Sequence, residues 1–208
     1  MNFNVLQPGT LHLFVGGMKG SKTVNFLRAF GQLAHTDLTT QLFKPKCDYR
    51  ESLHEQFGVP RNYIVSRTGI YAPATEVDDK DPEDILRKLD PDTKIVGLGE
   101  ISLFEKRDRL VEIILGFMGE GKVVIGDGLD KDFRGEPFDP IPTLMAYAVS
   151  VEKCYGVCDL NGCNKLGEYS QRLIDGEPAH YDSPQKVVGV NNYELRCLEH
   201  HIVPGKPE

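Results

Sequence analysis

The sequence of 208 residues predicts an α/β protein, with a mostly parallel β-sheet flanked by helices and a small Cys/His module at the C-terminal end. First, an apolar run at residues 11–15 leads through a glycine-rich loop into a segment with helical periodicity. Second, strand-like and helix-like runs alternate after it, as is typical of parallel sheets. Third, four of the five cysteines lie beyond residue 150, and such clustering indicates metal binding rather than disulfides in a reducing compartment.

The expected elements follow from apolar spacing along the chain. In order, they are a strand at 11–15, a helix at 22–33, strands near 41–43 and 62–65, a helix at 82–89, a strand at 94–98, a helix at 109–118 and a strand at 122–126. Near Ala148 the sequence changes to short β-like pieces, closely spaced cysteines and turn residues. We therefore expect an α/β domain of residues 1–148 and a zinc-binding module of residues 149–201. Residues 202–208 contain two prolines and little to bury, which predicts a disordered tail.

Composition restricts the classes of function. The chain is 40% hydrophobic and 26% charged, an ordinary globular balance. Its formal net charge of -7 argues against a protein that grips a nucleic-acid backbone. The sequence has no apolar stretch approaching 18 residues, and its start has neither a basic region nor an apolar signal core. We therefore expect a cytoplasmic protein with no nucleic-acid or membrane partner.

The glycine-rich loop has the features of a phosphate-binding loop between a strand and a helix. Its residues are Gly16, Gly17, Met18, Lys19, Gly20, Ser21, Lys22 and Thr23. Small residues let successive N–H groups face phosphate oxygens, the lysine reaches the β- and γ-phosphates, and the hydroxyl is a ligand for Mg²⁺. The strict pattern has glycine directly before the lysine, where this chain has Ser21, so a positive φ there would carry a cost. The alternative is a plain glycine-rich turn.

The C-terminal cysteines and histidines are spaced for a metal ion. Two pairs of candidate ligands, Cys158 with Cys163 and Cys197 with His200, can close a tetrahedral zinc site. Four ligands leave no open position, so this zinc is predicted to be structural. Cys154 and His201 are competing ligands by proximity, and the alternative is a set of buried free cysteines.

Several further motifs occur in a fixed order along the chain. They are GGMKGSKT at 16–23, KPKCDYR at 44–50, SRTG at 66–69, VGLGEISLF at 96–104, GLDKDF at 128–133 with PF at 137–138, and a closing series of Cys163, Ser170, Arg172, Gly189, Tyr193, Cys197 and His200. In this order the motifs resemble the thymidine kinase family of the zinc-containing, P-loop type, over residues 11–201.

The resemblance implies a RecA-like P-loop sheet and a zinc module whose lasso loop, about residues 172–193, closes over a nucleoside. It also implies transfer of the γ-phosphate of ATP, with Mg²⁺, to the 5′-hydroxyl of thymidine, deoxyuridine or a related pyrimidine nucleoside. The family is usually homotetrameric, a dimer being the alternative here, and is inhibited by thymidine triphosphate. The competing hypothesis is a catalytically degenerate relative that only binds nucleotide or nucleoside.

The resemblance also implies residue roles. Glu100 would be the general base, while Lys22 and Arg50 would offset charge on the transferred phosphoryl group. Nucleoside contacts would come from Met18, Leu129, Phe133, Ser170, Gly189 and Tyr193, with Phe133 stacking on the base. Two departures lie beside Glu100: Gly99 stands where the family has an aspartate that serves as a metal group, and Ser102 stands where it has a glutamine. A usual Mg²⁺ contact is therefore expected to be missing. Either Asp48 holds the metal through water, or the enzyme is slow, or catalysis has been lost.

Overall fold

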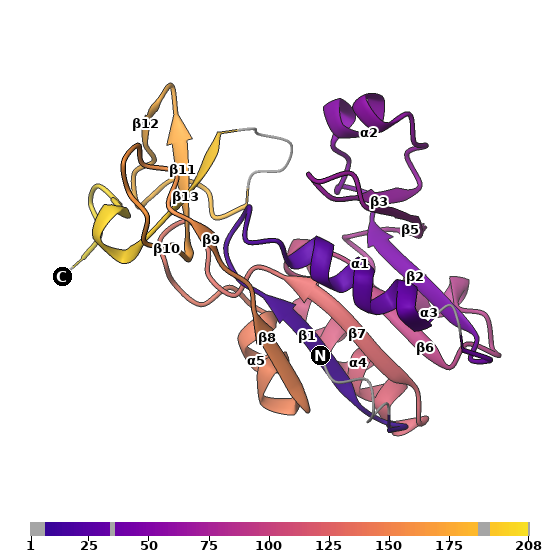
Figure 1. Ribbon diagram of the computed structural model, residues 1–208. Helices are drawn as coiled ribbons and strands as arrows, with labels where there is room; N and C mark the ends of the chain where they lie inside the picture. The colour runs from indigo at the N-terminus through magenta and orange to yellow at the C-terminus, as the bar shows by residue number, and fades with distance from the viewer. Residues whose placement is uncertain (1–6, 34–35, 187–191, 208) are drawn as a thin grey trace.

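The computed structural model describes residues 7–33, 36–186 and 192–207. Its centre is a six-stranded sheet in which every neighbouring pair is parallel (Figure 1). The strand order is β5 (Thr75–Val77), β2 (Thr40–Pro45), β6 (Ile95–Leu98), β7 (Val123–Gly128), β1 (Leu11–Val15) and β8 (Ser150–Lys153). The predicted parallel sheet is confirmed.

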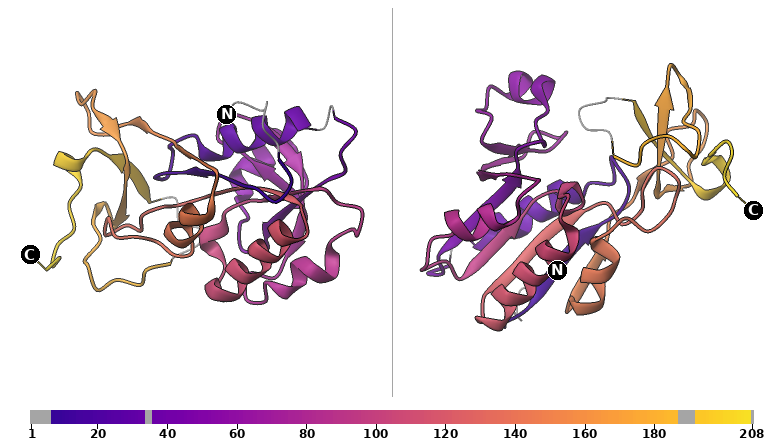
Figure 2. Two further views of the ribbon diagram at one scale, coloured as in Figure 1. Left: turned by 90° about the horizontal axis from the view of Figure 1, so that it is seen from below. Right: turned by 180° about the vertical axis from the view of Figure 1, so that it is seen from behind.

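Helices cover both faces of this sheet (Figure 2). Helix α1 (Lys22–Leu33) lies on one face, where Phe26 and Phe30 join Phe14 and Ile125 in a buried cluster. On the other face are α3 (Glu83–Lys88), α4 (Arg107–Gly119) and α5 (Ile141–Tyr147). Each helix buries the apolar stripe of its sequence, because that stripe recurs every three to four residues. No described helix has the length and apolar character needed to cross a bilayer.

One predicted strand of the series lies outside the large sheet. Strand β3 (Tyr63–Val65) pairs antiparallel with β4 (Tyr71–Pro73), and β5 takes the edge position instead. The buried Lys44 of β2 holds this hairpin, because its Nζ donates to the carbonyls of Arg61 at 3.0 Å and Tyr63 at 3.1 Å. Helix α2 (Glu51–Phe57) lies above the hairpin (Figure 1).

A small C-terminal unit lies beyond the carboxyl end of β1 (Figure 1). Its elements are β9 (Gly156–Val157), β10 (Leu166–Gly167), β11 (Tyr169–Ile174), β12 (Glu177–Pro178), β13 (Tyr193–Arg196) and a 3₁₀ turn, η3 (Leu198–His200). Strand β11 pairs antiparallel with both β12 and β13, and β9 pairs with β10. The small unit starts after β8, which belongs to the large sheet, although the sequence pattern changes at Ala148. Strand β8 reads SVEK, without the apolar run of the other strands, so its pairing with β1 is not apparent from composition.

The tail expected to be disordered lies against the small unit as far as it is described. Gln171 exchanges two hydrogen bonds with the backbone of Ile202, at 2.8 and 2.9 Å. The carbonyl of Pro204 accepts from the amide of Tyr181 at 2.8 Å. Residues 202–207 are therefore held by backbone hydrogen bonds, which the low apolar content does not reveal.

The segment 179–186, which we call the closing loop, is fastened at two places. Arg134 donates to the carbonyls of Tyr181 at 2.7 Å and Ser183 at 2.9 Å. At the other end Lys186 donates to the carbonyl of Leu103 at 2.6 Å and lies 3.6 Å from a carboxylate oxygen of Asp79. The loop therefore bridges the small unit and the large sheet.

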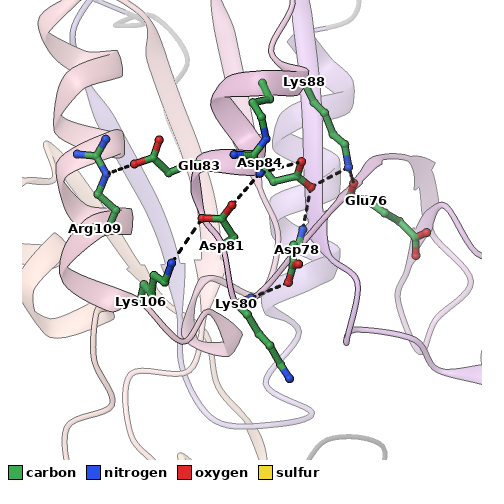
Figure 3. A network of polar contacts seen from close by, with 10 residues as sticks. Glu76, Asp78, Lys80, Asp81, Glu83, Asp84, Lys88, Lys106 and Arg109 are labelled. Atoms are coloured by element: carbon green, nitrogen blue, oxygen red, sulfur yellow. Dashed lines mark hydrogen bonds and ion pairs between the residues drawn. The ribbon is translucent and has the colours of Figure 1, made fainter.

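A polar network fixes the segment that carries Asp79 (Figure 3). The amide of Asp78 donates to Asp84 at 3.0 Å, and Asp84 also accepts from Lys88 at 2.8 Å. Arg109 of α4 contacts Glu83 of α3 at 2.9 Å. An ion pair such as Arg109–Glu83, in which both side chains are exposed, contributes little stability by itself. The hydrogen bonds from the amides of Asp78 and Lys80 matter more, because they fix the backbone on either side of Asp79.

Candidate active site

A cavity of about 520 Å³ opens at the carboxyl ends of the parallel strands, where α/β sheets bind their ligands. Its walls come from the glycine-rich loop, the segment before α2, the turn after β6 and the small unit. Among the predicted site residues, those lining it are Met18, Lys19, Gly20, Ser21, Lys22, Thr23, Asp48, Arg50, Glu100, Leu129, Phe133, Ser170 and Tyr193. Most of the proposed nucleotide and nucleoside residues thus share one cavity, whereas Gly16 and Gly17 are not among its lining residues.

The glycine-rich loop turns from β1 into α1 through two left-handed residues. Lys19 has φ 62° and Ser21 has φ 65°, so the positive φ expected at Ser21 is found. Gly20 is required by close approach, because a Cβ there would lie 2.8 Å from the carbonyl oxygen of Cys154. Inside the loop, Lys22 donates through Nζ to the carbonyl of Gly17 at 2.9 Å. Its ammonium group is therefore held within the ring of loop amides.

The strained serine leads to a stability prediction. Replacing Ser21 by glycine removes the left-handed cost of about 1–2 kcal/mol, offset in part by the greater freedom of glycine in the unfolded chain. We expect Ser21→Gly to raise the free energy of unfolding by up to about 1 kcal/mol, measured by urea denaturation. Ser21→Ala is the matched control, since alanine keeps the steric cost and should give no gain. An unchanged or lowered midpoint for Ser21→Gly would contradict this account.

Three charged side chains converge on the cavity from β6 and from the segment before α2. Arg50 donates through Nη2 to Glu100 at 2.5 Å, and its Nε lies 3.2 Å from Asp48. These carboxylates, Asp48 first, raise the pKa of the Arg50 guanidinium above its usual value. Glu100 and Asp48 are each 8% exposed. The cluster can therefore offer a cation and a carboxylate to a ligand at the same point.

Glu100 also has an unusual backbone. It follows β6 with φ 48° and ψ 50°, before the 3₁₀ turn η2 (Ile101–Leu103). Non-glycine residues take this conformation at a cost, and such residues gather at functional sites. The amide of Glu100 donates to Oδ1 of Asp127 at 2.8 Å, which holds the turn in place.

Asp127 is a candidate site residue that the sequence analysis did not identify. It is 1% exposed in β7, and its Oδ2 accepts from the Thr23 hydroxyl at 3.0 Å. Burial and then the nearby Glu100 raise the pKa of Asp127 to about 7. The sequence did carry a signal, because Asp127 directly follows the apolar run predicted as a strand at 122–126. Carboxylates at such strand ends lie at the edge where ligands bind.

The described nucleoside residues line the cavity from three places: the glycine-rich loop with Met18, the segment after β7 with Leu129 and Phe133, and the small unit with Ser170 and Tyr193. Met18 and Ser170 are joined, because the Met18 amide donates to the Ser170 hydroxyl at 2.9 Å. Phe133 lines the cavity but is only 2% exposed, with the guanidinium of Arg172 over its ring at 3.9 Å. Base stacking on this ring stays a prediction. Gly189 lies outside the described residues.

The four predicted zinc ligands come together beside β9 and η3. One ligand atom from each of Cys158, Cys163, Cys197 and His200 lies within 4.8 Å of all the others. Burial opposes ionisation of Cys158, but hydrogen bonds, first from the backbone of Cys197 and Leu160, lower its pKa to about 6. A thiolate near neutral pH is the form that binds zinc.

The two competing ligands are engaged elsewhere. The Cys154 sulfur lies 3.6 Å from the side-chain nitrogen Nδ2 of Asn25, beside the glycine-rich loop. His201 contacts the carbonyl of Phe133 through Nε2 at 2.9 Å and stacks on Tyr169. The geometry therefore favours the two original pairs as the candidate ligand set.

The Cys/His cluster is connected directly to the glycine-rich loop. Asp159 lies between the first two cysteines and accepts from Lys19 Nζ at 2.6 Å. The same carboxylate oxygen accepts from the amide of Leu195 in β13 at 2.8 Å. The segment between Cys158 and Cys163 thus supplies the Asp159 carboxylate, which joins the Cys/His cluster, the glycine-rich loop and β13.

Comparison with known proteins gives consistent matches over nearly the whole chain. The family model described as thymidine kinase matches residues 9–201. A thymidine kinase of Ureaplasma urealyticum serovar 10 is 36% identical over 205 residues, covering 96% of this chain and 85% of the relative. A thymidine kinase of Coprothermobacter proteolyticus is 37% identical over 203 residues, covering 97% of this chain and 95% of the relative.

Proposed function

This chain belongs to the thymidine kinase family, and we propose that it transfers the γ-phosphate of ATP to the 5′-hydroxyl of thymidine or deoxyuridine. The observation that carries the proposal is the single cavity that Lys22, Arg50 and Glu100 share with the residues assigned to the nucleoside. Phosphoryl transfer needs these groups in one place, because its catalysis consists mainly of positioning and charge stabilisation.

Each group has a role that its chemistry allows. Glu100 accepts the proton of the 5′-hydroxyl as that oxygen attacks the γ-phosphorus and the bond to the β-phosphate oxygen breaks, which releases ADP. Arg50, already beside Glu100 at 2.5 Å, faces the negative charge that develops on the transferred group. Lys22 and the loop amides hold the phosphates.

The residues present fit both proposed metals. Thr23 and the Asp127 carboxylate beside it are hard oxygen donors that suit Mg²⁺, and Mg²⁺ bound to ATP neutralises phosphate charge. The four Cys and His ligands suit a structural zinc with no open position. We propose one zinc per chain at that cluster.

The competing hypothesis of a catalytically degenerate relative is not favoured. It depended on Ser21 and Gly99, yet Lys22, Thr23, Arg50 and Glu100 all line the cavity. A modified pyrimidine nucleoside remains the second candidate substrate, since the spacing between Cys158 and Cys163 brings Asp159 to the loop of the site.

The test of the proposed function is product formation. Purified protein is incubated with Mg-ATP and a panel of thymidine, deoxyuridine, deoxycytidine and a 5-modified deoxyuridine, and nucleoside monophosphate is measured. We expect thymidine or deoxyuridine to be the preferred acceptor and deoxycytidine to be poor. Absence of any monophosphate with every acceptor would contradict the proposal.

The family relationship also motivates proposals about assembly and regulation. We propose a cytoplasmic homotetramer, with a dimer as the alternative, that thymidine triphosphate inhibits. Light scattering of the purified protein tests the oligomeric state. Turnover measured with increasing thymidine triphosphate tests the inhibition.

A further inference from the structure

The sequence predicts a missing Mg²⁺ contact, because Gly99 stands where the family pattern has an aspartate before Glu100. Position 99 directly follows β6, whose register pairs Leu98 with Gly126 of β7. Gly99 and Asp127 each follow directly after this last pair, so they come next to each other in the continued register of the two segments. The Asp127 carboxylate is on β7, which lies between β6 and β1. It is therefore one strand closer to β1 and to the glycine-rich loop than a carboxylate at position 99 would be.

The contacts of Asp127 give it two functions at once. Its Oδ2 accepts a hydrogen bond from the Thr23 hydroxyl at 3.0 Å, which leaves the lone pairs of the hydroxyl oxygen free to face a cation. Its Oδ1 accepts from the amide of Glu100 at 2.8 Å. Asp127 itself is buried, whereas Thr23 and Glu100 line the cavity. The carboxylate therefore acts through both neighbours.

The other carboxylates are placed less well for this role. A Cβ on Gly99 would lie 2.7 Å from Cδ1 of Ile64, so a side chain at 99 starts against the β3–β4 hairpin. Asp48 is paired with Arg50 at 3.2 Å. Among the described hydrogen bonds, Asp127 is the acidic residue joined to the Thr23 hydroxyl.

From this geometry we infer that Asp127 is the residue that positions the divalent cation of the bound nucleotide, replacing from β7 the carboxylate that the family pattern has at position 99. The inference rests on the proposed function. Asp127 is a positioning residue, because it reaches the cation through the Thr23 hydroxyl and through water, and it also orients the backbone of Glu100.

The experiment measures metal-dependent binding rather than turnover. Calorimetry gives the affinity for a non-hydrolysable ATP analogue with imido-linked phosphates, once with Mg²⁺ and once with a chelator. The variants are Asp127→Asn, which keeps size and loses charge, Asp48→Asn, which removes the competing carboxylate, and Asp84→Asn as a buried carboxylate of α3 outside the cavity. Asp127→Ser is the second variant if the asparagine protein does not fold.

We expect Asp127→Asn to lose at least tenfold of the enhancement by Mg²⁺ and to keep its affinity in chelator within about threefold. Asp48→Asn and Asp84→Asn should keep the enhancement. Thr23→Ala should lose it too, and the double variant with Asp127→Asn should lose little more, because the two residues act as one unit.

Retention of the enhancement by Asp127→Asn would overturn the inference, as would its loss in Asp48→Asn instead. If the parent makes monophosphate and Asp127→Asn binds Mg²⁺ and the analogue normally, only this inference fails. If the parent neither binds the analogue nor makes monophosphate, the proposed function fails with it.

Discussion

Glu100→Gln is expected to reduce kcat by about 10²–10⁴-fold, the usual contribution of a positioned general base. Glutamine keeps the size of the side chain and can still contact Arg50, but it cannot accept the proton of the 5′-hydroxyl. Thymidine affinity should stay within a few-fold, because the lost interaction acts in the transition state. Steady-state kinetics gives kcat, and calorimetry gives the dissociation constant.

The matched control is Glu112→Gln, on the solvent face of α4, with a side chain that is 63% exposed. Its kinetics should equal those of the parent. A Glu100→Gln protein with more than a tenth of the parental kcat would remove Glu100 as the base. A large loss of thymidine affinity at unchanged kcat would instead assign the residue to ground-state binding.

Cys197→Ser is expected to lose the zinc and much of the stability of the small unit. Structural zinc contributes roughly 10–16 kcal/mol of apparent binding free energy in small domains. A loss of one kcal/mol lowers Tm by about 2–4 °C in a chain of this size, so we expect a fall of at least about 10 °C. Metal analysis and thermal unfolding measure the two effects. ATP affinity should fall as well, because Asp159, within the cluster, holds Lys19.

Cys47→Ser is the control, since Cys47 lies outside the Cys/His cluster. It should keep one zinc per chain and the parental Tm. If Cys197→Ser retains the zinc content and the Tm of the parent, the assignment of the four ligands is wrong.

The sequence allowed much of the large sheet to be predicted, because its signals are local. The strand at 11–15 and the helix at 22–33 agree with β1 and α1 at both ends. Their apolar residues are regularly spaced, and glycines separate the two elements. The zinc ligands were equally accessible, since thiol and imidazole at short spacing have few other uses.

The remaining features depend on contacts between distant segments. Strand β8 was missed because its four residues, SVEK, are held by pairing with β1 rather than by their own pattern. Asp127 was missed for a related reason. The register of β6 with β7 brings it near Gly99, and the packing of α1 brings the Thr23 hydroxyl within hydrogen-bond distance of it. A motif compared position by position reports a lost aspartate at 99, whereas the three-dimensional arrangement shows a carboxylate on the next strand.

The two attachments of the closing loop differ in what they would allow the molecule to do over time. Arg134 fastens the start of the loop to its own neighbourhood, whereas at the other end Gln185 accepts from Arg107 of α4 and Lys186 reaches Leu103 and Asp79. Opening of this end of the loop therefore needs the contacts of two adjacent residues, Gln185 and Lys186, to break, while the contacts of Arg134 stay in place. The residence time of the product would then be set by a local opening near residue 186, and the turnover rate would be decoupled from any slower motion of the whole small unit.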